Sequence, residues 1–271
     1  MRRIFLLLLT ALSLKSLAQY PLELASPDQK IKVSIYPDDQ LSYDVFVDSQ
    51  PILAHSIIDM ELYGEVYMSH ILSVKSTKAR TVNEPIIAQV PVSRKNIPDN
   101  YNELSISFKN NFTVIFRAYN DGVAYRIATS FKDSITVVNE TADFHFVQGA
   151  QAWAPIITKT PDQDVFHTSF EELYPYKSLD SIGKNDYMYS PVLVNTFDNI
   201  KVAVTESDLD DYPGMFLRGT SSNGFQSAFA AYPAEEKVVP GDYPQKVVSE
   251  RAYYIAKTKG TRSFPWRALL I

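Results

Sequence analysis

Residues 112–127 read FTVIFRAYNDGVAYRI, and large apolar side chains occupy every second position on both sides of a short polar break. The alternating positions are Phe112, Val114, Phe116, Val123, Tyr125 and Ile127. An alternation of period two is typical of a strand with one face against a core. The break Asn120-Asp121-Gly122 favours a hairpin, because Asp-Gly readily adopts the positive φ that tight turns use. The segment therefore predicts two antiparallel strands joined by a tight turn.

The same alternation extends along much of the chain. It marks strands at 31–35, 41–47 and 104–108, with turns at Pro37-Asp38-Asp39 and Asn110-Asn111. Further strands are expected around 134–138, 143–147, 192–195, 200–204, 225–231, 247–256 and 264–271. Helical patterns are scarce, and the best candidate is Asp162–Leu173, which Pro175 ends. Many short strands separated by Pro, Asn and Asp turns predict an all-β fold, a sandwich of antiparallel sheets.

Residues 1–18 have the three parts of a secretory signal peptide. Arg2 and Arg3 are followed by an apolar run from Ile4 to Leu14 and by the cleavage motif Ser16-Leu17-Ala18. The run is too short for a typical membrane span, and an uncleaved anchor is the alternative. No cysteine follows the cleavage site to accept a lipid. We therefore expect export to the periplasm, without a membrane span.

Removal of residues 1–18 leaves 23 Lys and Arg against 31 Asp and Glu, a net charge of −8. This balance argues against nucleic acid as a partner, because phosphates are bound by clustered Lys and Arg. The chain has no cysteine, which excludes disulfides and thiolate chemistry. No linker or fixed-period repeat divides the sequence, so we expect one domain over residues 19–271.

Residues 204–217 read VTESDLDDYPGMFL and follow the alternating strand at 200–204. Four acidic residues fall within positions 206–211, and a rigid Pro213-Gly214 turn comes next. Clustered carboxylates repel one another unless water, hydrogen-bond donors or a cation neutralise them. The stretch is therefore either a solvated acidic turn or part of a cation site.

The four histidines are scattered without the spacing of a transition-metal site, so such a site is unsupported. They are His55, His70, His145 and His167. His145 alternates with Phe144 and Phe146, which predicts that it lies on the outer face of a strand.

The two tryptophans and one acidic pair are the remaining candidates for sugar contacts. Trp153 could stack on a sugar, although a core position is commoner for tryptophan. For Trp266 we expect a place in the core or at a domain interface. Glu171 and Glu172 are adjacent and point in different directions, so they cannot flank a sugar ring and are expected to be a surface pair.

Residues 204–217 resemble a signature of the N-terminal domain of glycoside hydrolase family 97, which comprises retaining and inverting α-glycosidases of polysaccharide-degrading bacteria such as Bacteroidetes. Three further segments agree with the resemblance. Residues 24–31 (LASPDQKI) resemble the family's opening strand, 116–126 (FRAYNDGVAYR) its central hairpin, and 262–267 (RSFPWR) the strand that leads out of the domain. The segments occur in the family's order, so the resemblance covers nearly the whole mature chain.

The resemblance implies a β-super-sandwich similar to galactose-mutarotase folds. In the family, this domain precedes a (β/α)8 barrel that carries the catalytic carboxylates and a small C-terminal β-domain. A barrel alone needs about 250 residues, and the sequence stops at Ile271. The resemblance thus implies no catalytic residue in this chain, which would be a fragment, a piece of a longer protein or a natural stand-alone domain. The implied partners are a barrel on the same or a separate chain and an α-linked oligosaccharide.

The resemblance also implies one metal ligand. Members with a calcium-dependent site take one glutamate from this domain and the others from the barrel, and Glu206 occupies the matching position. The implied function is that of a non-catalytic domain that supports an α-glycosidase active site and shares its calcium. The alternatives are a stand-alone carbohydrate-binding module and an aldose epimerase-like enzyme. An epimerase needs a histidine and a glutamate that converge on the sugar, and the scattered histidines give that alternative little support.

Overall fold

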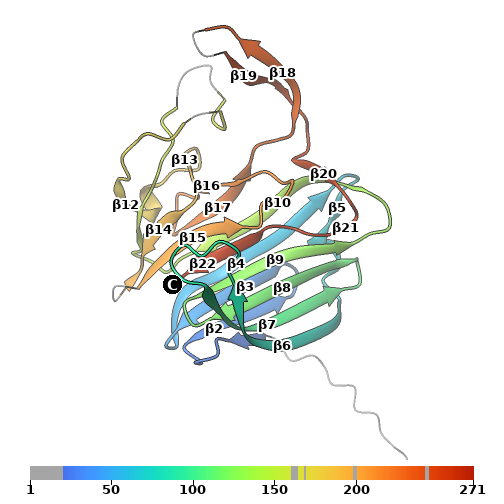
Figure 1. Ribbon diagram of the computed structural model, residues 1–271, viewed down its shortest axis with the longest axis vertical. Coiled ribbons are helices and arrows are strands. Elements are labelled where there is room, and N and C mark those ends of the chain that lie inside the picture. Colours follow the sequence, from blue (N-terminus) through green and yellow to red (C-terminus); the bar gives the residue numbers. More distant parts are fainter. Residues whose placement is uncertain (1–20, 160–163, 168, 198–199, 242–243) are drawn as a thin grey trace, which may run out of the picture.

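Two large antiparallel sheets dominate the computed structural model, which describes residues 21–159, 164–167, 169–197, 200–241 and 244–271 (Figure 1). The first sheet has the order β1-β2-β3-β4-β10-β17-β16-β13, with β5 paired to β4 and β20 to β10. Its strands are β1 (Leu22–Ala25), β2 (Ile31–Pro37), β3 (Leu41–Val47), β4 (Gln50–Leu62), β5 (Val66–Tyr67), β10 (Ile135–His145), β13 (Tyr187–Met188), β16 (Met215–Gly219), β17 (Gly224–Phe229) and β20 (Ala256–Thr258).

The second sheet has the order β12-β11-β14-β15-β22-β9-β8-β7-β6, with β21 paired to β9. Its strands are β6 (Val74–Ile87), β7 (Asn96–Phe108), β8 (Phe112–Tyr119), β9 (Gly122–Ser130), β11 (Gln151–Trp153), β12 (Tyr176–Ser178), β14 (Val192–Asn195), β15 (Lys201–Ser207), β21 (Thr261–Ser263) and β22 (Trp266–Leu270). A separate hairpin, β18 (Pro233–Val239) and β19 (Gln245–Arg251), stands apart from both sheets at the top of Figure 1. Two short 3-10 turns complete the described elements, η1 (Met68–Ile71) and η2 (Leu179–Ser181).

The core lies between the inner faces of the two sheets. Tyr43 of the first sheet contacts Phe116 and Tyr125 of the second, with ring centroids 5.7 and 5.4 Å away. Side chains from both sheets form one buried apolar cluster, and each large side chain in it contributes about 1.5–3 kcal/mol by leaving water. The predicted all-β sandwich of antiparallel sheets is confirmed.

The hairpin at the centre of the sequence is also confirmed, but for a different reason than its sequence suggested. Strands β8 and β9 pair from Phe112↔Thr129 to Tyr119↔Gly122, and the turn lies at Asn120 and Asp121. None of the turn residues has a positive φ. Glycine is needed at 122 because a Cβ there would lie 2.4 Å from the carbonyl oxygen of Leu269 on β22.

Most other predicted strands are present, with some changes. The segments 134–138 and 143–147 belong to the single strand β10, while 247–256 overruns β19, which ends at Arg251. The described part of the helix candidate, 164–167 and 169–173, contains a turn and no helix, and its other residues lie outside the described ranges. The expected signal peptide, residues 1–18, also lies outside them. Among described residues, no helix has the length and apolar character that crossing a membrane requires.

Candidate functional site

Glu206 lies near the end of β15, on the face of that strand that points into the sandwich. Val202 and Val204 are fully buried, and the period of two places Glu206 on their side of the strand. The side chain of Glu206 is only 9% exposed. Its Oε1 accepts a hydrogen bond of 2.7 Å from the backbone N–H of Met215, the first residue of β16. Glu206 is therefore turned inward and held by the strand that follows the acidic loop.

A buried arginine on the neighbouring strand of the same sheet forms an ion pair with this glutamate. Arg267 on β22 is the register partner of Glu206, and its Nη1 donates to Glu206 Oε2 at 2.6 Å. Its Nε and Nη2 donate to Oε1 and Oε2 of Glu140, at 2.7 and 2.9 Å. Glu140 belongs to β10 of the opposite sheet, so this bidentate pair connects the two layers. We call Glu140, Glu206 and Arg267 the carboxylate–arginine cluster.

The cluster is almost dry, and its charges are unequal. The side chains of Arg267 and Glu140 are 0% and 3% exposed. Burial raises the pKa of the Glu206 carboxyl, and the nearby charge of Arg267 opposes that rise. Burial alone would lower the pKa of Arg267, but Glu140 outweighs it and the pKa rises above its ordinary value. With both carboxylates ionised, two negative charges face one positive charge, which leaves a surplus of −1.

Tyr212, in the loop between β15 and β16, completes the cluster. Its hydroxyl donates to Glu140 Oε2 at 2.9 Å. Burial, and then the charge of Glu140, raise the pKa of this hydroxyl, which keeps it a neutral donor. The Glu140 carboxylate therefore receives three hydrogen bonds, whereas Glu206 receives one from Arg267 and one from the backbone.

The aspartates of the acidic loop are exposed, and arginines contact the loop at each of them. Asp208 is 52% exposed and forms an ion pair of 2.9 Å with Arg126. Arg262 donates to the backbone carbonyls of Asp210 and Asp211, at 2.9 and 3.4 Å. For these three aspartates the solvated-turn interpretation is confirmed. They line an open pocket of about 520 Å³ together with Thr258, Lys259, Arg262 and Ser263.

The metal-ligating side chains of this region do not form a complete site. Within the part of the chain that the structure describes, no three or more His, Cys, Asp or Glu side chains are grouped to hold a metal ion. One inward carboxylate, Glu206, can supply a single ligand, while calcium takes six to eight oxygens. An ion at Glu206 would therefore need most of its ligands from another domain.

Both tryptophans lie on the outer face of the second sheet, so a core position is wrong for each, and the domain-interface alternative for Trp266 stays a prediction. Trp266 is half-buried, with the guanidinium carbons of Arg117 and Arg126 at 4.5 and 4.7 Å from its ring centroid. The parity of β22 places Trp266 outward because its neighbour Arg267 points inward. Trp153 is half-buried beside Tyr176, with the ring centroids 4.4 Å apart.

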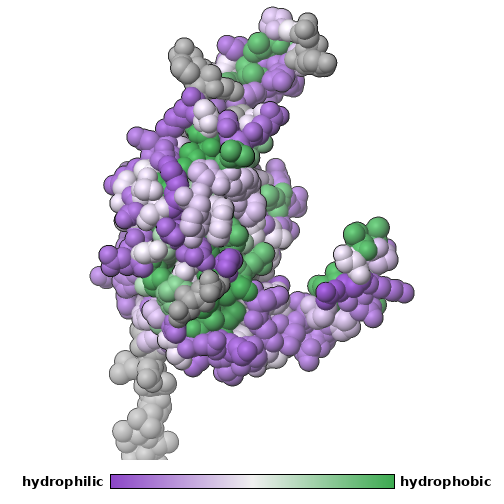
Figure 2. Space-filling model, turned by 90° about the vertical axis from the view of Figure 1, so that its left-hand side faces the viewer, coloured by the Kyte–Doolittle hydropathy of each residue, from purple (hydrophilic) through white to green (hydrophobic). Residues whose placement is uncertain are grey.

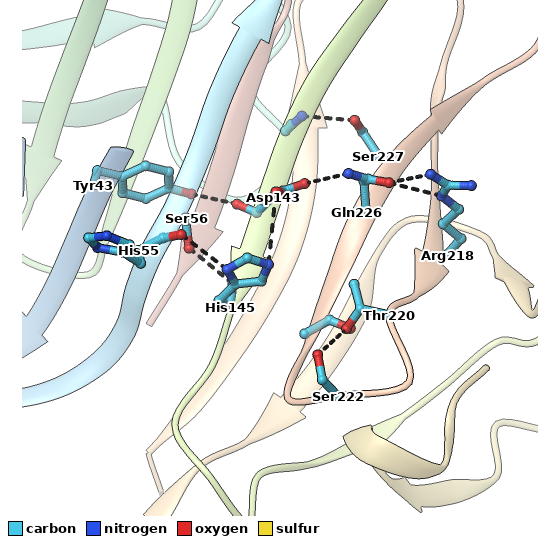
Figure 3. A network of polar contacts seen from close by, with 12 residues as sticks. Tyr43, His55, Ser56, Asp143, His145, Arg218, Thr220, Ser222, Gln226 and Ser227 are labelled. Atoms are coloured by element: carbon cyan, nitrogen blue, oxygen red, sulfur yellow. Dashed lines mark hydrogen bonds and ion pairs between the residues drawn. The ribbon is translucent and has the colours of Figure 1, made fainter. Parts of the chain in front are cut away.

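The remaining candidates lie away from the cluster. Glu171 and Glu172 are both exposed, as the surface interpretation predicted. His145 is partly exposed on β10, as expected, and Figure 3 shows it beside Asp143. Its Nε2 is 3.8 Å from an Asp143 carboxylate oxygen, and its Nδ1 is 3.0 Å from the His55 carbonyl. The same figure shows Gln226 between Asp143 and Arg218. This histidine is thus paired with an aspartate instead of the glutamate that an epimerase needs.

Comparison with known proteins identifies the family of this chain. Residues 24–271 match the family described as glycosyl-hydrolase 97 N-terminal. The chain belongs to glycoside hydrolase family 97. A retaining alpha-galactosidase of Bacteroides thetaiotaomicron is 36% identical over 274 residues, which cover 98% of this chain and 41% of that protein. The chain therefore spans less than half the length of this curated relative.

Solved structures agree with this family 97 fold. A family 97 enzyme from Pseudoalteromonas sp. strain K8, in complex with acarbose, superposes with a TM-score of 0.74 at 18% identity, over 92% of this chain and 35% of that one. A crystal structure of a beta-arabinopyranosidase gives 0.75 at 19% identity, over 92% and 40%. At these identities the likeness shows the fold, which is that of the N-terminal β-sandwich.

The sequence singled out Glu206 only through the family resemblance, and its buried partners Glu140 and Arg267 were missed. Glu140 and Arg267 are 127 positions apart, and each is a charged residue at an inward position of an alternating strand. A charge at such a position rarely occurs without a buried partner. A charged residue at an inward strand position therefore predicts a buried partner for both Glu140 and Arg267. The sequence does not show that the two residues are each other's partner.

Proposed function

We propose that this chain is the non-catalytic N-terminal domain of an exported α-glycosidase, and that it supports an active site carried by a (β/α)8 barrel on the same or a separate chain. The observation that carries the proposal is the family 97 match over residues 24–271, combined with a relative of which the chain spans 41%. The signal-peptide pattern of residues 1–18 supports export to the periplasm. The name of the galactosidase relative makes an α-galactoside the first substrate to test.

We further propose that Glu206 supplies one ligand of a calcium ion shared with the barrel. The chemistry of the cluster fits a cation, because two carboxylates face one guanidinium and the surplus charge is negative. The carboxylate is also fixed in place by Arg267 and the Met215 N–H, so little entropy is lost when it binds. Carboxylate oxygens are ligands that calcium prefers.

In this proposal, the residues of this chain position the metal ligand and take no part in bond cleavage. Arg267 and the Met215 N–H hold the Glu206 carboxylate in one orientation. Glu140, on the opposite sheet, accepts two hydrogen bonds from Arg267 and holds that guanidinium in turn. When bound, calcium supplies positive charge that orients a sugar or a catalytic carboxyl near the scissile bond. The domain thus orients one calcium ligand of the active site and supplies no catalytic carboxyl.

Turnover of aryl α-glycosides tests the first proposal. Residues 19–271 should hydrolyse neither an aryl α-galactoside nor an aryl α-glucoside, whereas the longer protein that carries the barrel should hydrolyse one of them. Activity of the short chain that a single carboxylate substitution abolishes would overturn the proposal.

Two carboxamide variants of the longer protein test Glu206. E206Q is nearly isosteric, and it should lower kcat/KM and weaken the response to added calcium. D210N is the matched control, because Asp210 lies in the loop that directly follows β15 and has an exposed side chain, and it should change neither quantity. A fully active E206Q variant with an unchanged calcium response would make Glu206 an ordinary structural residue.

One observation favours a second function, that of a stand-alone carbohydrate-binding module. Trp153 and Tyr176 form an aromatic pair on the outer face, and Tyr176 is 44% exposed. Sugars stack on such aromatic faces. If this function holds, residues 19–271 should bind an α-linked oligosaccharide by calorimetry, and W153A should abolish the heat of binding while W266A should not.

A further inference from the structure

The hairpin of β6 and β7 extends well beyond the sheet to which it belongs. Strand β7 pairs with β8 only from Tyr101↔Tyr119 to Ser107↔Thr113. The pairing of β6 with β7 continues past that point to Ile87↔Asn96. Residues 83–87 and 96–100 therefore pair with each other alone, and we call residues 83–100 the distal arm. Figure 2 shows this arm standing off the body, with hydrophobic residues at its end.

The end of the distal arm is apolar and exposed. Five aliphatic side chains there are between 42% and 92% exposed, namely Ile86, Ile87, Val90, Val92 and Ile97. A two-stranded ribbon without further strands is marginally stable in water, and contiguous exposed apolar residues mark interaction surfaces. Arg94 and Lys95 in the same tip are exposed and add positive charge. The surface that fits this tip is an apolar groove with an acidic rim.

The distal arm begins at the same end of the second sheet at which β22, the last strand of the chain, ends. Tyr119, opposite the base of the arm, is followed directly by the β8–β9 turn. The N–H of Ile271 donates to the Asp121 carbonyl in that turn, at 2.9 Å. Leu270, one residue earlier, is opposite Gly122 and is 56% exposed. A domain that continues from Ile271 would therefore begin beside the base of the arm.

We propose that the distal arm is a clasp for the catalytic domain, with Val90 and Val92 seated in an apolar groove of that domain. The inference rests on the proposed function, because the galactosidase relative has more than half of its length beyond the part that this chain matches. The hairpin of β18 and β19 also projects with exposed valines, Val238 and Val239, and it serves as the comparison. It lies at the opposite end of Figure 1 from β6 and β7.

Hydrogen exchange tests the clasp in the longer protein. Amides of residues 86–97 should exchange about tenfold or more slowly there than in residues 19–271, because docking excludes water and restricts opening. In the longer protein, V90S/V92S should remove that protection, whereas V238S/V239S should leave it unchanged. Equal exchange of residues 86–97 in the two wild-type proteins would overturn the proposal without any variant.

The remaining outcomes separate the clasp from its competitors and from the proposed function. Protection that depends on protein concentration and accompanies a dimer lost in V90S/V92S would assign the tip to a second copy, and would overturn the clasp. Hydrolysis of an α-glycoside without tip protection would leave the function standing and refute the clasp. Tip protection in a longer protein that hydrolyses neither aryl glycoside would support the clasp and refute the α-glycosidase.

Discussion

Replacement of Arg267 by methionine is the most direct test of the carboxylate–arginine cluster. The substitution keeps an unbranched side chain but removes the charge that separates Glu140 from Glu206. Both carboxylates remain in place, with side chains 3% and 9% exposed. Loss of one partner from a buried ion pair costs about 3–5 kcal/mol. Since a domain has about 5–15 kcal/mol of stability in total, R267M should lose a large part of it.

The free energy of unfolding lost in R267M should be larger at neutral pH than at acidic pH. Burial already raises the pKa of Glu206, and Arg267 limits the rise, so R267M raises that pKa further. The folded variant then binds protons more tightly than the unfolded chain. A carboxyl with a raised pKa is best tolerated when protonated, below its ordinary pKa of about 4.3. The penalty therefore shrinks as the pH falls from about 7.5 to about 5.

Urea unfolding of residues 19–271, followed by the fluorescence of Trp153 and Trp266, measures both effects. The control is R80M, because Arg80 is 48% exposed and its partner Glu103 keeps Arg117 at 2.9 Å. We expect R80M to cost about 1 kcal/mol or less at either pH. The triple variant E140Q/E206Q/R267M should recover most of the loss, because it leaves no buried charge in the cluster. An R267M penalty below about 1 kcal/mol at pH 7.5, or one independent of pH, would refute this account of the cluster.

Three further predictions concern the same region. Millimolar calcium should raise the Tm of residues 19–271 by less than about 2 °C, because one carboxylate binds calcium weakly and stabilisation follows RT ln(1 + [L]/Kd); a large shift in differential scanning calorimetry would indicate a complete site within the chain. Since the pKa of Glu206 is raised, E206Q should gain free energy of unfolding relative to wild type as the pH rises from about 4 to about 7; a wild-type advantage that grows with pH in urea titrations would contradict this. G122A should cost about 1–3 kcal/mol, because its Cβ would lie 2.4 Å from the Leu269 carbonyl oxygen, whereas G241A, with nothing within 4 Å, should unfold at nearly the wild-type urea concentration.

The fold class was readable because apolar alternation is a local property. Strands such as β8 and β9 bury every second side chain along most of their length, so sequence spacing identifies them directly. Strand β6 was missed because nearly all of its residues are exposed, which removes the alternation that burial imposes. Strand β4 was missed because its pattern is interrupted near His55, a non-glycine residue with a φ of 57°, where the register with β3 shifts.

The candidate site could be predicted only in part, because the groups that bind Glu206 come from other strands that are distant in the sequence. The family resemblance marked Glu206 as a ligand position but gave no direction for its side chain. It could not show that Arg267 and the N–H of Met215 would already occupy that carboxylate. The family signature likewise gave four acidic residues without their environments. The structure separates them by burial, since Glu206 faces the core while the three aspartates face water or arginines.

The cluster gives Glu206 opposite energetic roles in the isolated domain and in the proposed enzyme. Burial penalises its negative charge, so in the isolated domain the neutral variant E206Q should be at least as stable as wild type near neutral pH. A calcium ion shared with the barrel would reverse that balance, because the same surplus charge would then attract the ion. E206Q should accordingly preserve or increase the stability of residues 19–271 while weakening calcium binding and activity in the longer protein. A residue retained only for packing would lower stability in both proteins, and the sign of the effect in the isolated domain therefore distinguishes a ligand from a structural side chain.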